Sequence, residues 1–385
     1  MVERVAIVAV AQTRFKRRAD KVRMQDIVWE VVKPVVEETG LQFIEGMGID
    51  NTISCSDDFY DARTISDGGI TDYIGGHMRS EEKVSMDSLQ AVFYAYACIL
   101  SGHYDVTLVV AHSKESQAIS RNLITNTAFD PIFNRMLGLD YVQAGALQAK
   151  AYMLKTGATR KDLAQAVVKS RKMAALNSYA QEKKAVTVTD VLDAPMVADP
   201  LGKLDIYPVS DGAVAMILAR ESKAKNLTDK PVWILGGGCC YDSFYIGDRD
   251  LTHSSALEDA AGKAYKMARI TAPTRQLDVA EISTHFSYQE PMLYEGLKFC
   301  ARGKGVEMLK SGATEINGKL PVNPSGGILA GNPYMVGGIT RAAECYLQLT
   351  GKAGKHQVKG AKKALAHGTG GPAGIFHSVM ILGID

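Results

Sequence analysis

The sequence has no long hydrophobic run, almost no excess of charge of either sign, and few prolines. No apolar stretch approaches the roughly 18 residues that a membrane-spanning helix requires. Lysine and arginine number 44 against 42 aspartate and glutamate residues, so the net charge of +2 gives no strong positive field for nucleic acid. With 12 prolines, 46% hydrophobic and 22% charged residues, the composition excludes a disordered chain. The 385 residues suit one large or two medium domains.

Cysteine is also scarce. The spacing of the six cysteines fits neither a metal site nor the disulfide framework of a small secreted protein. They are Cys55, Cys98, Cys239, Cys240, Cys300 and Cys345. The first ten residues carry an early acid and an early base in a strand-like pattern, which is unlike a signal peptide. We therefore expect a reduced, cytoplasmic protein with no metal of its own, no nucleic-acid partner and no membrane span.

Strand-like apolar runs alternate with helical periods, which predicts an α/β fold with helices packed on a sheet. Within 24–38 and 87–102, apolar residues recur at steps of three and four, as on one face of a helix. Residues 106–111 (VTLVVA) form a continuous apolar run typical of a buried strand. Further strands are expected at 5–10, 211–218, 232–236, 279–282 and 377–383, and further helices at 256–268, 291–301 and 338–349.

The middle of the chain differs in composition from its flanks. Between 113 and 203, Met, Gln, Asn and Lys become more frequent, and Thr159 with Asp162 predicts the capped start of a helix that runs to about residue 175. We interpret 113–203 as a helical excursion that leaves the sheet and returns to it. The charged stretch 220–230 then divides the chain into an N-terminal half, 1–225, and a C-terminal half, 226–385. Both halves share one order of elements, which suggests an internal duplication.

Several short segments carry a family pattern when they are read in order. The first half contains Ile7-Val-Ala-Val-Ala-Gln-Thr13 and Pro208-Val-Ser-Asp-Gly-Ala213, and the second half contains Asn323-Pro-Ser-Gly-Gly327 and Gly368-Thr-Gly-Gly371. Together with the helix after residue 87 and the strand that follows it, these segments resemble the thiolase superfamily, especially its sterol-carrier-type (non-specific lipid-transfer) branch. The resemblance covers nearly the whole chain.

The resemblance implies a five-layered α/β/α/β/α fold of two duplicated halves. It also implies acyl-CoA substrates, with coenzyme A present as part of the substrate and no covalently bound cofactor. A homodimer is implied, and so is a small zinc-ribbon/OB-fold partner subunit. Any zinc would belong to that partner, because this chain lacks the cysteine pairs for it.

The family places a nucleophilic cysteine at the start of the helix that here begins near residue 87, where backbone N–H groups lower the pKa of a thiol. By the spacing to Leu89-Gln-Ala91, that position is Ser85. A serine needs an adjacent base to act as a nucleophile. The alternative is that Ser85 only caps the helix or lines the cavity.

A second family motif carries a histidine three residues before a phenylalanine. Here Phe286 takes the place of the phenylalanine and Ser283 that of the histidine, while His285 is displaced along the loop by two residues. The resemblance makes Ser283 and Phe286 candidate substrate-binding residues. His285 is a candidate general acid or base, although a loop histidine can equally serve to bond a backbone carbonyl.

The third and fourth motifs also depart from the family pattern. Asn332 stands where the family has a histidine, and it can donate a hydrogen bond but cannot carry a proton at neutral pH. Tyr334 follows as a candidate proton carrier or an aromatic wall of the acyl pocket. In the fourth motif no thiol is present, and His367 is the titratable group. The glycines that shape the loops remain, which makes these four candidate substrate-binding positions: Gly326, Gly327, Gly370 and Gly371.

These departures favour altered chemistry in a retained cavity. The leading hypothesis is retro-aldol cleavage of a β-hydroxyacyl-CoA without a covalent intermediate, with Tyr334, His285 or His367 moving protons and Asn332 with the amides at Gly370 and Gly371 holding the enolate. One alternative is an acyl-CoA C-acyltransferase (a thiolase) that uses Ser85 or a cysteine. Another is a non-catalytic scaffold that binds acyl-CoA. Contacts to the CoA phosphates are sought among the basic residues of the excursion: Arg160, Lys161, Lys169, Arg171, Lys172, Lys183 and Lys184.

Overall fold

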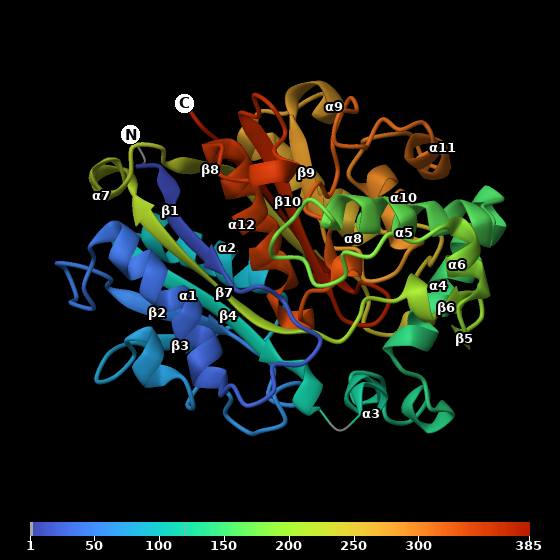
Figure 1. The fold of residues 1–385 in the computed structure, drawn as a ribbon, viewed down its shortest axis with the longest axis horizontal. Coiled ribbons are helices and arrows are strands. Elements are labelled where there is room, and N and C mark those ends of the chain that lie inside the picture. Colours follow the sequence, from blue (N-terminus) through green and yellow to red (C-terminus); the bar gives the residue numbers. More distant parts are fainter. Residues whose placement is uncertain (1–2, 119) are drawn as a thin grey trace.

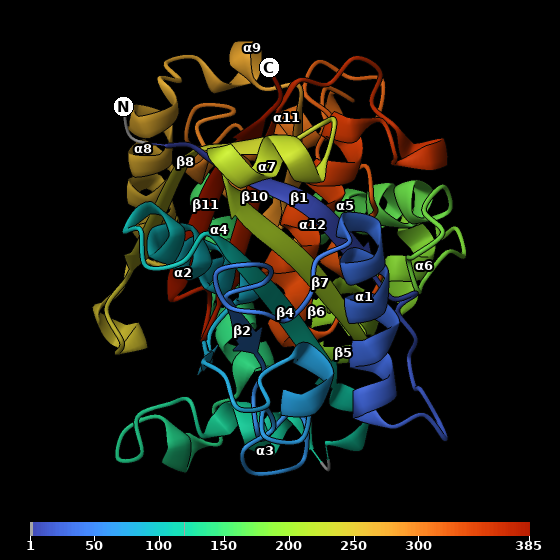
Figure 2. The ribbon, with the colours of Figure 1, turned by 90° about the vertical axis from the view of Figure 1, so that its left-hand side faces the viewer.

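The computed structural model describes residues 3–118 and 120–385. The first half of the chain contributes five strands of a mixed sheet, in the order β3-β2-β4-β7-β1. Strands β2 and β4 are parallel, whereas β7 is antiparallel to both β4 and β1. Figure 2 shows β4, β7 and β1 side by side across the molecule. The strands are β1 (Val5–Gln12), β2 (Asn51–Cys55), β3 (Glu81–Lys83), β4 (Val106–Lys114) and β7 (Asp211–Arg220).

The second half repeats this arrangement. Its strands are β8 (Val232–Tyr241), β9 (Val279–Ile282), β10 (Lys363–Gly370) and β11 (Phe376–Gly383). Their order, β9-β10-β11-β8, follows that of β2-β4-β7-β1, with the same parallel pair and the same two antiparallel pairs. The expected duplication is therefore confirmed in the topology. Strands β1 and β8 also pair at Ala6–Trp233, which joins the halves into one nine-stranded sheet.

Four helices complete the layers around the two halves of the sheet (Figure 1). Helix α1 (Met24–Thr39) covers the outer face of the first half, and α8 (Ser255–Ala268) covers that of the second. Helices α2 (Ser88–Leu100) and α12 (Gly337–Thr350) lie between the halves, where their side chains share one core with strands from both halves of the sheet. This arrangement is the predicted five-layered α/β/α/β/α fold.

The helical excursion is also present. It contains α3 (Arg121–Asn126), α4 (Tyr141–Thr156), α5 (Arg160–Ala174) and α6 (Val188–Asp193), followed by the short hairpin of β5 (Met196–Ala198) and β6 (Leu201–Gly202). The predicted cap of α5 forms, because Thr159 Oγ1 accepts a hydrogen bond from Asp162 N (3.3 Å). Helix α4 packs on the second half, where Gly145 leaves room for the Phe286 ring.

One predicted boundary differs from the structure. The helix expected at 291–301 is α10 (Gln289–Gly296), and it stops early because Lys298 adopts a left-handed backbone conformation (φ 57°). The charged stretch proposed as a division between halves contains helix α7 (Glu221–Leu227). The remaining helices are α9 (Pro273–Gln276) and α11 (Gly305–Lys310). None of the helices in the described residues is long and apolar enough to cross a bilayer.

Candidate active site

A cavity of about 290 Å³ opens at the N-terminal ends of α2 and α12, and it brings together residues from both halves. Ser85 and Met86 line it from the start of α2, and Tyr334 lines it from the segment before α12. Gly371 belongs to the turn after β10. The cavity therefore contains the predicted Ser85, Tyr334 and Gly371 together. Aromatic walls complete it: Phe59, Tyr60, Tyr141 and Phe376.

Ser85 does not cap helix α2. The N-cap is Asp87, whose Oδ1 accepts from Leu89 N (2.9 Å), while Ser85 is exposed at the cavity. Of the two alternatives for Ser85, lining of the cavity is therefore the one that its position fits. No histidine or carboxylate is hydrogen-bonded to its hydroxyl among the described residues, so the structure holds no base poised to activate it.

Asp87 is a residue that the sequence did not identify as functional. Its Oδ2 accepts from Gly338 N (3.0 Å), so one carboxylate binds the first turns of both α2 and α12. A Cβ on Gly338 or on Gly368 would lie 1.9 Å from Asp87 Oδ1, which explains why glycine occupies both positions. Burial raises the pKa of Asp87 to about 7 against these stabilising N–H donors.

The Tyr334 phenol is held at a fixed place in the cavity. Its Oη accepts from Gly371 N (2.9 Å), and its ring stacks on Tyr60 with centroids 5.1 Å apart. The ring edge of Tyr141 lies against it at 5.5 Å. Burial raises the pKa of Tyr334, although the Gly371 amide acts in the opposite direction, so the group is a neutral phenol at neutral pH. The Gly371 amide is thereby occupied by the phenol and is not free to hold an enolate.

His285 lies behind Tyr334 rather than on the cavity surface. It is fully buried, with its ring 5.3 Å from that of Tyr334 and 5.1 Å from that of Tyr207. Neither ring nitrogen has a hydrogen-bond partner within the described residues. Burial, with the nearby charges of Arg121 and Arg341, lowers the pKa of His285 to about 3. His285 is therefore a neutral imidazole whose lone pair is uncommitted, and its ring does not serve to bond a backbone carbonyl.

His367 occupies a different environment from the one expected. Ser283 N donates to its Nδ1 (3.3 Å), so the hydrogen of the neutral ring lies on Nε2, which donates to His377 Nδ1 (2.9 Å). His377 Nε2 then donates to Ser254 Oγ (2.8 Å) at the start of α8. Burial lowers the pKa of both imidazoles. Both nitrogens of His367 are engaged and the ring does not line the cavity, so its position does not support the expected proton transfer to the substrate.

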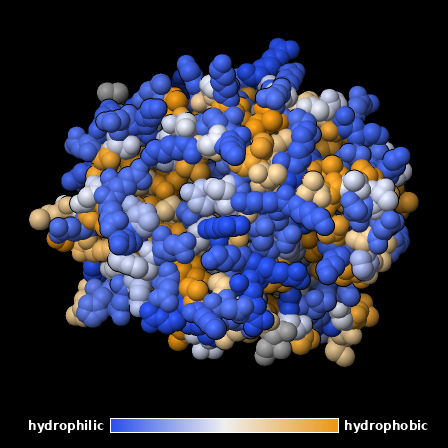
Figure 3. All heavy atoms as spheres, viewed as in Figure 1, coloured by the Kyte–Doolittle hydropathy of each residue, from blue (hydrophilic) through white to orange (hydrophobic). Residues whose placement is uncertain are grey.

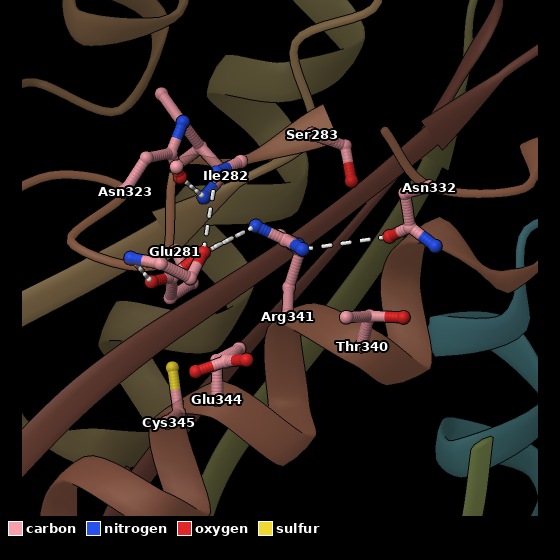
Figure 4. A network of polar contacts seen from close by, with 12 residues as sticks. Glu281, Ile282, Ser283, Asn323, Asn332, Thr340, Arg341, Glu344 and Cys345 are labelled. Carbon is pink, nitrogen blue, oxygen red and sulfur yellow. Dashed lines mark hydrogen bonds and ion pairs between the residues drawn. The ribbon is translucent and has the colours of Figure 1, made fainter. Parts of the chain in front are cut away.

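Asn332 is fixed by an arginine that the sequence analysis missed. Arg341 donates one N–H to Asn332 Oδ1 (3.4 Å) and another to Glu281 Oε2 (2.7 Å), as Figure 4 shows. Ser325 joins this buried network through its hydroxyl, which donates to Glu281 (2.7 Å). Because the guanidinium can only donate, the amide atom of Asn332 that faces it is the oxygen. The Asn332 Nδ2 therefore points away from Arg341. That Nδ2 has no partner among the described residues.

The remaining predicted residues shape the site rather than line it. Ser283 Oγ donates to His367 O (2.8 Å), and Phe286 is fully buried against Tyr141 (5.1 Å). Gly326 and Gly327 have positive φ angles of 97° and 66°, which an L-residue with a side chain rarely adopts. They form the turn that carries Ser325 toward Glu281. A Cβ on Gly370 would lie 2.5 Å from the Phe376 ring, which lines the cavity.

Within the described residues, no cysteine lines this cavity. The Cys55 thiol lies beneath its floor and donates to Met86 O (3.2 Å). Burial raises the pKa of Cys55 well above its ordinary value, so it remains a thiol. Among residues 3–118 and 120–385, no group of three His, Cys, Asp or Glu side chains is arranged to hold a metal ion.

A second cavity, of about 300 Å³, is lined by basic side chains. Tyr207 separates it from the first, because Tyr207 lines the second cavity while its ring lies 6.0 Å from that of Tyr334. The basic lining residues are Arg17, Arg121, Arg171 and Lys203, and Glu182 is the acidic one. Of the basic residues expected to meet phosphate, Arg171 lines this cavity and pairs with Glu182 (3.1 Å). Lys169 is instead buried in an ion pair with Glu290.

Comparison with known proteins agrees with this geometry. The family described as "Thiolase C-terminal domain-like" matches residues 237–384. An acetyl-CoA acetyltransferase of Methanothermobacter thermautotrophicus is 32% identical over 378 residues, which are 96% of this chain and 97% of that protein. Human sterol carrier protein 2 is 31% identical over 73% of this chain and 54% of its own length. A solved structure, "Ltp2-ChsH2(DUF35) aldolase", superposes with a TM-score of 0.84 at 22% identity, covering 100% of this chain and 99% of its own.

The chain therefore belongs to the thiolase superfamily, in its sterol-carrier-type thiolase-like branch. The solved aldolase shares its fold. The resemblance read from the sequence is confirmed at both levels, the family and the five-layered architecture.

Proposed function

We propose that this protein makes or breaks a carbon–carbon bond in an acyl-CoA thioester, and that it does so by retro-aldol cleavage of a β-hydroxyacyl-CoA without a covalent intermediate. One observation carries the proposal: the cavity between the two halves presents a phenol, Tyr334, while a serine stands where the family has its cysteine. The solved structure with the same fold is described as an aldolase, which supports the same assignment.

The proton movements follow from the state of Tyr334. In the cleavage, the β-hydroxyl loses its proton, the Cα–Cβ bond breaks, and the electron pair passes to the thioester as an enolate. The enolate is protonated at its α-carbon. A neutral phenol is too weak a base to take the hydroxyl proton first, so the two transfers at Tyr334 are coupled: the phenol proton passes to the α-carbon as the phenol oxygen takes the β-hydroxyl proton, which returns the enzyme to its starting state. His285 behind the ring is the second proton acceptor, with a free lone pair but weak basicity.

The enolate oxygen needs a hydrogen-bond donor that is not already used. Gly371 N–H is bound to Tyr334, and we therefore assign the oxyanion role to Asn332 Nδ2, the amide end that Arg341 leaves free. One such donor is typically worth about 3–4 kcal/mol of barrier. Asn332 thus stands in place of a proton-carrying histidine. Its amide can stabilise the negative charge of an enolate by a hydrogen bond but cannot transfer a proton.

The basic cavity supports recognition of coenzyme A. Arg17 and Lys203 are exposed at its rim, and they have no ion-pair partner within the described residues. They can pair with the diphosphate of CoA, while Tyr207 lies between this cavity and the candidate reaction site. The CoA thioester is therefore proposed to extend from this cavity toward Tyr334.

We also propose a small zinc-ribbon/OB-fold partner subunit. The name of the structural neighbour pairs an aldolase with a second component. In this chain, two apolar side chains beside the cavity are exposed, Phe59 (64%) and Leu123 (69%). Phe59 and Leu123 line a groove of about 530 Å³ that shares Phe59 and Ile124 with the cavity. A partner would cover this surface. The homodimer remains a prediction from the family.

A second candidate function is acyl exchange by a thiolase mechanism. Two archaeal relatives named acetyl-CoA acetyltransferase, at 32% and 30% identity, favour it. In this chain the nearest candidate thiol would be Cys55, which would have to leave its bond to Met86 and lose its proton.

The test uses the full chain with any subunit that copurifies with it. Incubation with a β-hydroxyacyl-CoA is expected to release an aldehyde or ketone and a shortened acyl-CoA, before and after complete labelling with iodoacetamide. Activity lost in proportion to labelling of one thiol would favour acyl exchange instead. Binding of CoA by calorimetry without turnover of β-hydroxyacyl-CoA or β-ketoacyl-CoA would indicate a non-catalytic scaffold.

A further inference from the structure

A third cavity, of about 390 Å³, lies between the segment that follows α5 and the loop that follows α12. One wall is formed by residues 175–179 together with Lys183, and the other by residues 352–356. Neither wall belongs to the candidate active site or to the basic cavity described above. Its volume is that of a small-molecule site.

The titratable side chains that line this cavity are mainly basic. They include Lys183, Lys352, Lys355 and His356, and no acidic side chain of the described residues lines it. Lys352 pairs with Glu38 (2.8 Å) at the rim, and Lys183 donates to Ser178 O (2.8 Å). Lys355 has no ion pair within the described residues. Figure 3 shows a predominantly hydrophilic centre on the face where the segment after α5 crosses the molecule in Figure 1.

The buried side chain of His356 also lines the cavity. His356 is 3% exposed, and its Nε2 lies 2.9 Å from Glu344 Oε2. Burial acts to lower the pKa of His356, but the hydrogen bond and charge of Glu344 raise it overall. Burial and the nearby Arg14 lower the pKa of Lys183, as expected where positive charge is not fully balanced.

The same wall contacts the loop that carries Ser325, Gly326 and Gly327. Asn177 Nδ2 donates to Ser325 O (3.0 Å) and to Glu344 Oε1 (3.3 Å). Ser325 in turn binds Glu281, which pairs with Arg341, the residue that orients Asn332. A ligand in this cavity would therefore touch the segment that holds the Ser325 loop in place.

We propose that this cavity is a binding site for a phosphate group, held by Lys183 and Lys355 with Lys352 and His356. Lysine is a common partner of phosphate, and a tetrahedral anion can accept from several such donors at once. The phosphate belongs either to a free phosphorylated ligand or to the 3′-phosphate of coenzyme A. The site rests on the cavity and its charges and does not depend on the proposed reaction.

The test is calorimetric titration of the full chain at constant ionic strength with inorganic pyrophosphate, CoA and dephospho-CoA. The double variant K183Q/K355Q keeps the side-chain length but removes two charges, and K359Q, an exposed lysine outside the cavity, is the matched control. We expect the double variant to raise the Kd of the bound phosphate compound about tenfold or more, and K359Q to leave it unchanged. Circular dichroism establishes that both variants are folded.

The pattern of loss identifies the source of the phosphate. Weakened pyrophosphate binding with unchanged CoA binding indicates a free phosphorylated ligand. Weakened CoA binding with unchanged dephospho-CoA binding indicates the 3′-phosphate of the substrate. The proposal is overturned if neither pyrophosphate nor CoA binds the double variant more weakly than it binds K359Q. Because binding is measured directly, this result is separate from any failure to observe carbon–carbon cleavage.

Discussion

The starts of the two central helices, α2 and α12, occupy equivalent places in the two halves but are built differently. Helix α2 has its own cap, Asp87, whereas α12 has no side-chain cap from its own half. Its first N–H groups are bound across the duplication instead, Gly338 N by Asp87 and Ile339 N by Ser88 Oγ (2.9 Å). One half therefore supplies the caps for both helices.

This asymmetry separates structure from chemistry. Because α12 is capped by the first half, the segment before it has no capping duty and can place Tyr334 at the cavity and Asn332 against Arg341. The equivalent segment before α2 supplies the cap and presents Ser85 and Met86 to the cavity. We therefore assign reactivity to the start of α12 and stability to the start of α2. The following variants test this division of roles.

Tyr334→Phe is expected to have the largest effect. The variant keeps the stack on Tyr60 but removes the phenol, so kcat for carbonyl release should fall about 10²- to 10⁴-fold with little change in stability. Ser85→Ala, at the equivalent helix start, should stay within about threefold of the parent. Equal losses in the two variants would show that chemistry is not confined to the α12 side.

Asp87→Ala should chiefly reduce stability. Two buried N–H groups, of Leu89 and Gly338, lose their acceptor, so the free energy of unfolding in urea should fall by about 2–4 kcal/mol. Ser88→Ala, which removes one such bond, should cost about 1 kcal/mol. A double-mutant cycle sharpens the test, because Gly368→Ala should cost less once the Asp87 carboxylate is removed, when only the contact to Leu89 Cβ (2.9 Å) remains tight. Additive effects of Asp87→Ala and Gly368→Ala would contradict the close approach of the Asp87 carboxylate to Gly368.

The orientation of Asn332 provides a test of intermediate size. Replacing Arg341 alone leaves Glu281 buried without a counter-ion, which costs about 3–5 kcal/mol, so the informative variant is R341Q/E281Q. It removes both charges, and we expect kcat to fall about tenfold while KM is nearly unchanged. Thr340→Ser, next to Arg341 on α12, is the control. A rise in KM without loss of kcat would place Arg341 in binding rather than in positioning.

The last test concerns the pH dependence of stability rather than the reaction. The folded pKa of His285, about 3, lies below the ordinary histidine value of about 6.5, so the unfolded chain binds one more proton than the folded one between these values. Stability should therefore be complete above about pH 6.5 and fall as the pH drops toward 3. The variant His285→Gln should lose about 1.4 kcal/mol per pH unit of that slope. An unchanged slope in urea unfolding would show that His285 is already protonated in the fold.

Much of the fold could be predicted from local pattern. The periods of α1, α2 and α12 and the apolar runs of β4 and β9 are properties of short segments, and the motif order brought Ser85, Tyr334 and Gly371 to one cavity. The end of α10 could not be predicted in this way, because it depends on the backbone conformation at Lys298. The boundary between halves at residue 225 remains a prediction.

The parts that escaped prediction depend on contacts between distant segments. Asp87 reads as an ordinary N-cap, and nothing nearby indicates that its second oxygen binds Gly338, 251 residues away. Arg341 lies on an amphipathic helix and is recognised as functional only through Asn332. Likewise, the basic residues of the excursion look alike in sequence, yet Lys169 is buried with Glu290 while Lys183 lines an open cavity.

The most direct test of the account is the mass of the intact protein, quenched in acid during steady turnover of a β-hydroxyacyl-CoA. The account predicts the unmodified mass in every quenched sample while an aldehyde or ketone accumulates. An added acyl mass that maps to Ser85 or Cys55 and disappears with product formation would contradict it, because the reaction would then proceed through a covalent acyl-enzyme.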